Sequence, residues 1–168
     1  MIGPGAYDID IVNNISAILQ QREETLAVAE SVTAGQLQVA FSLADGATQI
    51  LQGGITAYNI GQKARHLNVD PVHAGNTNCV SQKVADQMAA AVLQLFSADW
   101  GIAITGYASP VPEEGIYELF AYYSIYHRQH CVKCGRITTP SREPMGVRTD
   151  FTNIVLHKFH EACRQIGI

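Results

Sequence analysis

The chain has 168 residues, of which 47% are hydrophobic and 15% charged, and its formal net charge at pH 7 is −4. A chain of this length and composition can bury a core of its own, so we expect one folded domain over residues 1–168 and exclude intrinsic disorder. Its 11 Lys and Arg residues, set against 15 Asp and Glu residues, form no basic run, so nucleic acid is not an expected partner.

The expected location follows from the N-terminus, the hydropathy and the cysteines. Residues 1–10 contain Gly, Pro and Asp where a signal peptide needs a positive start and an apolar centre. No stretch approaches the roughly 18 consecutive apolar residues of a membrane-spanning helix, so no membrane contact is expected. The 4 cysteines are too few for a disulfide scaffold, and we expect a protein of the reducing cytoplasm.

The first half of the chain alternates helical spacing of apolar residues with short β-prone runs. Its predicted elements are a helix with Asp8 as its N-cap, a strand over 25–29, a helix from Gln36, a strand over 54–58, a helix over 60–67 and a loop over 72–79.

The second half begins with a long amphipathic pattern. Its predicted elements are a helix over 84–95 capped by Ser81, a strand over 100–105, an irregular segment over 106–115, a hairpin of strands over 116–126 and 131–138, and a helix over 147–162. Strands separated by helices imply parallel pairing, and the hairpin adds antiparallel strands. We therefore predict a three-layer α/β/α sandwich with a mixed, mostly parallel sheet.

Side chains with hydroxyl groups follow each of the first three predicted strands. Ser31 and Thr33 follow the first strand, Tyr58 the second, and Thr105 stands at the end of the third. Ligands of open α/β sheets bind beyond the carboxyl ends of the strands, so these residues are candidates for one site. Lys63 is the nearest candidate base for deprotonating a serine.

Each of these residues also has a purely structural explanation. Ser31 and Thr33 are suitable N-caps for the second helix. Tyr58 is typical of a strand end with its hydroxyl in water, Lys63 of a solvated helix surface, and Thr105 of an ordinary strand. Only the convergence of three strand ends favours the functional explanation.

A group of histidines and cysteines carries the usual ligands of zinc. His127, His130, Cys131 and Cys134 are close in sequence. If 131–138 is a strand, however, residues three apart point to opposite faces, whereas a zinc-binding C-x-x-C pair needs a tight turn. No metal is therefore expected, and the phosphate-loop, dinucleotide-binding and G-x-S-x-G motifs do not occur.

Short motifs in a fixed order carry a resemblance to a known family. They are Ala29-Glu-Ser-Val-Thr-Ala-Gly35, Gly53-Gly54 with Ala57-Tyr58-Asn59 and Lys63, Asn68-Val-Asp-Pro71, Val80-Ser81 before a long helix, and Ala103-Ile-Thr-Gly106. In order and spacing they resemble the CinA C-terminal domain family, competence/damage-inducible proteins whose active members are nicotinamide-nucleotide amidases. The resemblance starts near Asp8 and is strongest between Ala27 and Gly106.

This resemblance implies an α/β/α fold and hydrolysis of nicotinamide mononucleotide to nicotinate mononucleotide and ammonia, without a metal or other cofactor. The expected partner is a small pyridine nucleotide or a related amide, and a homo-oligomer is compatible with the family. By position the implied residues are Ser31 as nucleophile, Tyr58 and Lys63 as activating and reprotonating groups, Thr33, Thr105 and Gly106 as substrate-binding residues, and Arg142 or Arg148 as the phosphate ligand.

The chain departs from the family pattern near the expected site. Ala34 replaces a glycine, and Tyr107, Glu113 and Glu114 replace small residues. A Cβ at position 34 is expected to crowd the backbone, and two carboxylates within about 8 Å of a phosphate would repel it. Two hypotheses therefore stand: an amidase that acts on nicotinamide mononucleotide or a related pyridine nucleotide, and a divergent domain that binds a ligand or partner chain without turnover. The departures predict weak binding of the mononucleotide and low or absent amidase activity on it.

Overall fold

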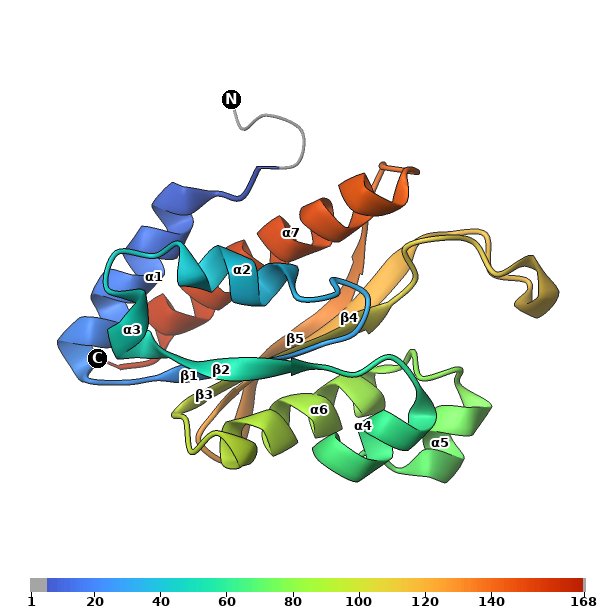
Figure 1. Ribbon diagram of the computed structural model, residues 1–168, viewed down its shortest axis with the longest axis horizontal. Helices are drawn as coiled ribbons and strands as arrows, with labels where there is room; N and C mark the ends of the chain where they lie inside the picture. Colours follow the sequence, from blue (N-terminus) through green and yellow to red (C-terminus); the bar gives the residue numbers. More distant parts are fainter. Residues whose placement is uncertain (1–5, 168) are drawn as a thin grey trace.

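A five-stranded mixed sheet forms the middle layer of the computed structural model, which describes residues 6–167 (Figure 1). The strands are β1 (Leu26–Glu30), β2 (Leu51–Thr56), β3 (Trp100–Gly106), β4 (Phe120–His127) and β5 (His130–Thr138), in the order β2-β1-β3-β4-β5. β1 is parallel to β2 and β3, and β4 is antiparallel to β3 and β5, so four of the five strands point the same way.

Helices cover both faces of this sheet (Figure 1). One face carries α1 (Ile9–Arg22), α2 (Gln36–Ser42), α3 (Ala47–Ile50) and α7 (Pro144–Gln165). The other face carries α4 (Ile60–Leu67), α5 (Pro71–Asn76) and α6 (Gln82–Leu95). The predicted three-layer α/β/α sandwich is therefore confirmed.

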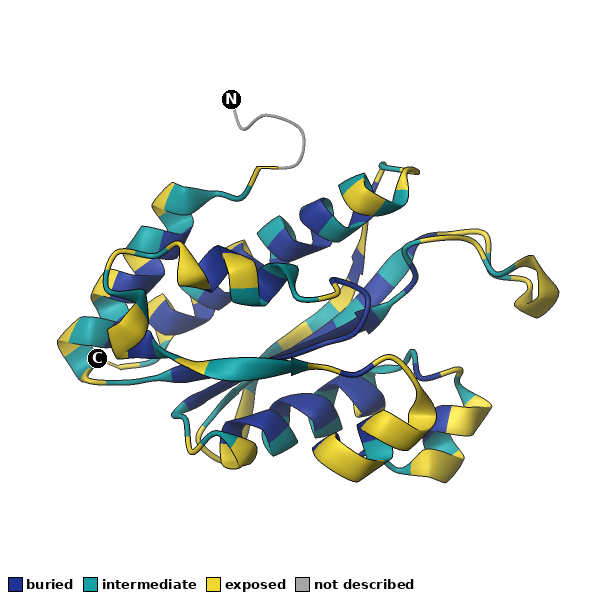
Figure 2. Cartoon of the chain, in the orientation of Figure 1, coloured by how far each residue is buried: buried dark blue, intermediate teal, exposed yellow. Residues whose placement is uncertain are grey.

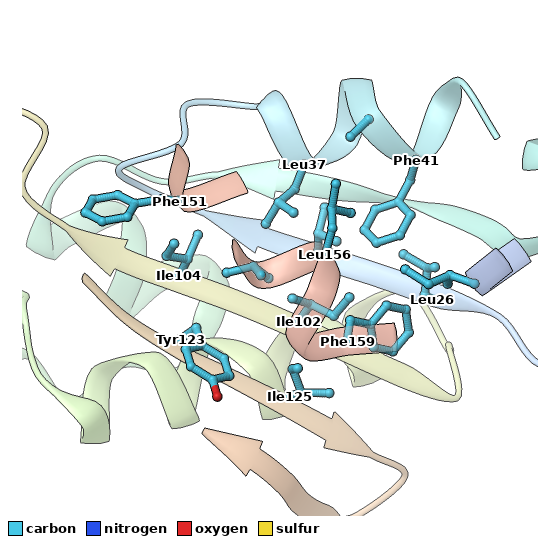
Figure 3. Packing of buried hydrophobic residues seen from close by; sticks show 14 of the residues in the cluster. Leu26, Leu37, Phe41, Ile102, Ile104, Tyr123, Ile125, Phe151, Leu156 and Phe159 are labelled. Carbon is cyan, nitrogen blue, oxygen red and sulfur yellow. The ribbon is translucent and has the colours of Figure 1, made fainter. Parts of the chain in front are cut away.

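Each face of the sheet has its own hydrophobic core, and the buried residues lie on the sides of the helices and strands that face one another (Figure 2). In the larger core Phe41 and Phe159 pack edge to face, with ring centroids 5.9 Å apart (Figure 3). The smaller core is built largely from alanine and valine, which lets α6 approach β3 closely. A Cβ at Gly101 would lie 2.2 Å from the Ala89 carbonyl oxygen, so glycine is required there.

Two predicted N-caps are confirmed, and one predicted loop is wrong. The Asp8 side chain accepts a hydrogen bond from the N–H of Ile11, and Ser81 caps α6 in the same way. Residues 72–79 were expected to be irregular, yet they contain most of α5. Asp70 accepts hydrogen bonds from two amides of its first turn, and Pro71 occupies the first helical position. Capping thus stabilises a helix that is too short to have a visible period.

The segment 107–119 projects from the body of the protein and is largely exposed (Figures 1 and 2). Apart from a 3-10 turn at Pro112–Glu114 and a bridge between Val111 and Ile116, it is irregular, as predicted, although Gly106, expected to be its first residue, still belongs to β3. The strand expected from residue 116 begins only at Phe120, because the chain first returns along this projecting loop.

No helix within residues 6–167 combines the length and the apolar character needed to cross a bilayer. Residues 1–5, which form part of the stretch that argues against a signal peptide, lie outside the described residues.

Candidate functional site

A cavity of about 300 Å³ opens at the carboxyl ends of β1, β2 and β3. The sequence-predicted residues that line it are Ser31, Tyr58, Lys63, Thr105, Gly106 and Arg148. Thr33 and Arg142 are not among its lining residues. The parallel pairing of β1 with both of its neighbours explains this gathering, because it brings three strand ends to the same edge.

A serine and a buried lysine form the centre of the cavity. Ser31 directly follows β1, and its backbone N–H donates to the carbonyl of Ile104 at 3.1 Å. Lys63, on α4, is only 1% exposed. Its Nζ lies 3.0 Å from Ser31 Oγ and 2.9 Å from the Ala57 carbonyl oxygen. The explanation of Lys63 as a solvated surface residue is therefore wrong.

Burial gives this lysine an unusual acidity. Loss of hydration lowers the pKa of Lys63 below its ordinary value, against a smaller opposing effect of the nearby Cys79. A neutral amine has a lone pair that can accept the hydroxyl proton of Ser31, which an ammonium group lacks. Lowering the pKa therefore increases the fraction of the protein in which Lys63 can act as a base.

The N–H of Gln36 donates to the Thr33 carbonyl, and the side chain of Glu30, rather than the hydroxyl of Ser31 or Thr33, satisfies the next two amides of α2. Its buried carboxylate accepts hydrogen bonds from the backbone N–H groups of Leu37 at 2.8 Å and Gln38 at 3.1 Å. The hydroxyl of Thr33 donates to the same carboxylate at 2.6 Å. The N-cap explanation is therefore wrong for both hydroxyl residues, and the role of Glu30 was not predicted from the sequence. An acid seven residues before an apolar helix position is a weak signal on its own.

The turn after Ser31 contains a residue in the left-handed conformation. Ala34 has a φ of 54°, and Gly35 follows with a φ of 100°. This conformation costs a residue with a Cβ about 1–2 kcal/mol, which glycine avoids. The Ala34 side chain is exposed and does not line the cavity, so the cost of this substitution lies in the backbone of the turn.

The end of β3 supports a second strained segment beside the cavity. Thr105 is 1% exposed, and its hydroxyl donates to the Cys79 carbonyl at 2.7 Å. Asn78 and Cys79, which also line the cavity, have φ values of 50° and 61°. Residues other than glycine in this conformation cluster at functional sites. No local sequence signal distinguishes them, and burial raises the pKa of the Cys79 thiol.

Of the two candidate arginines, Arg148 is the one at the cavity. Its Nε donates to the Val32 carbonyl at 3.1 Å, and its Nη2 lies 3.5 Å from the hydroxyl of Tyr58. Tyr58 is 61% exposed, so its ring forms part of the rim. Arg142 is exposed and donates instead to carbonyl groups of its own segment.

The substitutions in the projecting loop affect the cavity less than expected. Tyr107 lines the cavity but is 8% exposed, and it packs against Phe120 with ring centroids 5.3 Å apart. It is therefore a fixed wall of the cavity. Glu113 and Glu114 lie in the 3-10 turn at the tip of the projecting loop and do not line the cavity (Figure 1). These two carboxylates therefore do not form part of the cavity wall, although the charge of Glu114 contributes to raising the pKa of Tyr107.

Comparison with known proteins gives a consistent family assignment along the chain. A family model described as the CinA C-terminal domain matches residues 8–163. A CinA-like protein of Prochlorococcus marinus is 42% identical over 96 residues, which cover 57% of this chain and 23% of that protein. Another CinA-like protein, from Frankia casuarinae, is 38% identical over 116 residues, which cover 67% of this chain and 27% of that protein. The chain thus spans about a quarter of the length of the curated relatives it matches.

Solved structures with the same fold come from the same group of proteins. The competence damage-inducible protein A of Klebsiella pneumoniae superposes with a TM-score of 0.89 at 21% identity, covering 96% of this chain and 99% of that one. A CinA superfamily protein of Escherichia coli gives a TM-score of 0.83 at 23% identity, covering 90% and 87%. At such low identities this likeness concerns the fold alone.

Proposed function

Because the chain belongs to the CinA C-terminal domain family, we propose that it is an amidase that hydrolyses the carboxamide of nicotinamide mononucleotide or a related pyridine nucleotide. The products are nicotinate mononucleotide and ammonia. The observation that carries the proposal is the 3.0 Å contact between Lys63 Nζ and Ser31 Oγ inside a cavity. A hydroxyl beside a buried amine is an arrangement that activates a serine nucleophile.

In the first half of the proposed reaction, Ser31 Oγ attacks the amide carbon while neutral Lys63 accepts its proton. Lys63 then gives this proton to the amide nitrogen, the C–N bond breaks, and ammonia leaves an ester on Ser31. Val32 follows the nucleophile and lines the cavity, and its N–H donates no hydrogen bond within residues 6–167, so we assign this N–H as the donor to the developing oxyanion.

In the second half, water attacks the ester carbon and Lys63 accepts a proton from that water. The proton returns to Ser31 Oγ as the ester bond breaks, which releases the carboxylic acid and restores the enzyme. The Ala57 carbonyl, 2.9 Å from Lys63 Nζ, fixes the direction of the amine through both halves. Lys63 is therefore the acid and base of each step.

The phosphate of the substrate is assigned to Arg148. One N–H of its guanidinium group is already used by the Val32 carbonyl, which fixes the group at the cavity and leaves other donors for a phosphate. Thr105 positions the backbone at Cys79 beside the cavity, since its hydroxyl donates to the Cys79 carbonyl.

Ammonia release from three amides tests this proposal. We expect purified protein to release ammonia fastest from nicotinamide mononucleotide, more slowly from nicotinamide riboside and least from nicotinamide, because Arg148 attracts only a phosphate. Release from none of them, together with calorimetric binding of the mononucleotide, would favour the alternative of a domain that binds without turnover. A protein that neither releases ammonia nor binds the mononucleotide would contradict both hypotheses.

A further inference from the structure

Two cysteines of β5 and an aspartate of α6 lie together on the α6 side of the sheet. One ligand atom from each of Asp86, Cys131 and Cys134 lies within 4.8 Å of the others, and none of the three lines the amidase cavity. No other His, Cys, Asp or Glu group of three within residues 6–167 meets this spacing. We propose that these residues bind a divalent cation with an affinity for sulfur, of which Zn²⁺ is the principal example.

A β-bulge brings the two cysteines to one face. The pairing of β4 with β5 shifts between Ile125 and Tyr126, so that Val132 is an extra residue in β5. An extra residue resets the alternation of side chains along a strand. Cys131 and Cys134 consequently share a side although they are three positions apart. The argument from simple alternation, which places them on opposite faces, is therefore wrong.

The spacing suits a metal better than a disulfide bond. In a tetrahedral zinc site two sulfur ligands lie about 3.8 Å apart, and an oxygen and a sulfur ligand about 3.5 Å apart. The spacings of this group, all within 4.8 Å, therefore need to contract by at most about 1.3 Å. The two cysteines pair with residues two positions apart on β4. Their Cα atoms are therefore about 6.8 Å apart, at the upper limit of disulfide geometry.

The carboxylate of Asp86 is oriented by a neighbouring amide. Gln82 precedes it by one helical turn, and its Nε2 donates to Asp86 Oδ1 and to the Tyr123 carbonyl, each at 3.0 Å. Hydrogen bonds of this kind fix the direction of ligating carboxylates in metal sites. The third ligand is thus held on the side where the cysteines stand.

The donor set and its exposure define the cation. Two thiolates exclude Mg²⁺ and Ca²⁺ as preferred occupants, because these ions favour oxygen ligands. Cys131 and Cys134 are exposed and Asp86 is half-buried, so an ion can enter from solvent and a water molecule can complete four ligands. Each thiol gives up its proton when it binds the ion.

Titration of the reduced protein with Co²⁺, followed by displacement with Zn²⁺, tests the site. We expect one equivalent of Co²⁺ to produce a thiolate-to-metal charge-transfer band that Zn²⁺ removes. Cys131→Ser and Cys134→Ser should each abolish the band. Asp86→Asn should keep the band but weaken binding at least about tenfold, since losing even an outer partner costs roughly 10–100-fold. Zn²⁺ should also raise the Tm of the wild-type protein and not that of Cys134→Ser.

Asp10→Asn, at an exposed position of α1, is the matched control and should bind Co²⁺ as the wild type does. Circular dichroism shows whether each variant keeps its fold. A wild-type protein without the band would overturn the proposal. So would a band that survives in Cys131→Ser or Cys134→Ser, or an affinity that falls equally in Asp86→Asn and Asp10→Asn.

Discussion

Lys63 Nζ and Ser31 Oγ are 3.0 Å apart, and the protonation state of the lysine determines what this contact can do. A charged ammonium group donates to the hydroxyl and cannot take its proton. A neutral amine accepts the proton and makes Ser31 a nucleophile. Because burial lowers the pKa of Lys63, the neutral form becomes available below the pH at which an exposed lysine titrates.

Replacing Lys63 with arginine should lower the rate of amide hydrolysis about 10²–10⁴-fold, because a guanidinium group stays charged and cannot act as a base. The wild-type rate should rise with pH until Lys63 is neutral, and the variant should lack this rise. Rate measurements from neutral to alkaline pH check both expectations. Lys83→Arg, at an exposed position of α6, is the control and should keep the wild-type profile. A wild-type rate in Lys63→Arg would contradict the assignment.

The two arginines differ in what they contact, and this difference predicts their effects. Arg148→Ala should raise KM for the mononucleotide far more than for the riboside, because only the former carries a phosphate. Arg142→Ala should change neither value, since Arg142 is exposed and does not line the cavity. Steady-state kinetics on both substrates provide the comparison. Equal losses on the two substrates would show that Arg148 acts only on the fold.

At the level of elements, one helix cap and one side-chain contact hold the segment that joins α5 to α6. Ser81 accepts from the N–H of Val84 at the start of α6, and its hydroxyl also lies 2.8 Å from His73 Nε2 on α5. Cys79 and Val80, immediately before this cap, line the cavity. The capping interactions therefore fix one wall of the site as well as the helices.

Ser81→Ala should destabilise the protein by about 1–2 kcal/mol, because it removes an N-cap and a hydrogen bond to the preceding helix. Ser97→Ala, beyond the other end of α6, is exposed and should leave the stability unchanged. Denaturant unfolding of both variants measures the difference. If Ser81→Ala were as stable as Ser97→Ala, the cap would not contribute to stability.

Local patterns predict most elements here but not the contacts between them. Periodicity and turn residues identify the main strands and helices, and Asp8 and Ser81 are recognisable caps. Asp70-Pro71 carries the same capping signal, but the residues after it lack periodicity, and the loop predicted there is wrong. The burial of Lys63 depends on how α4 packs against the sheet. The bulge at Val132 depends on strand pairing, so a strand pattern alone does not contain it.

Across the whole molecule, the topology brings distant parts of the chain to one cavity. β1 lies between β2 and β3 and is parallel to both, so Ser31, Tyr58 and Thr105 reach the same edge of the sheet. α7 crosses the opposite layer from α4 and supplies Arg148 (Figure 1). The site at the strand ends can therefore be predicted from the sequence. The choice between Arg142 and Arg148 depends on how α7 packs against the sheet, which the sequence pattern does not show.

The most direct test of the account is ammonia release from nicotinamide mononucleotide by the wild type and by Ser31→Ala, with the Tm of each recorded in parallel. The wild type should turn over the substrate, and the variant should be slower by at least about 1000-fold with nearly the same Tm, because Ser31 does not cap α2. Turnover by Ser31→Ala at the wild-type rate would contradict the assignment of Ser31 as the nucleophile.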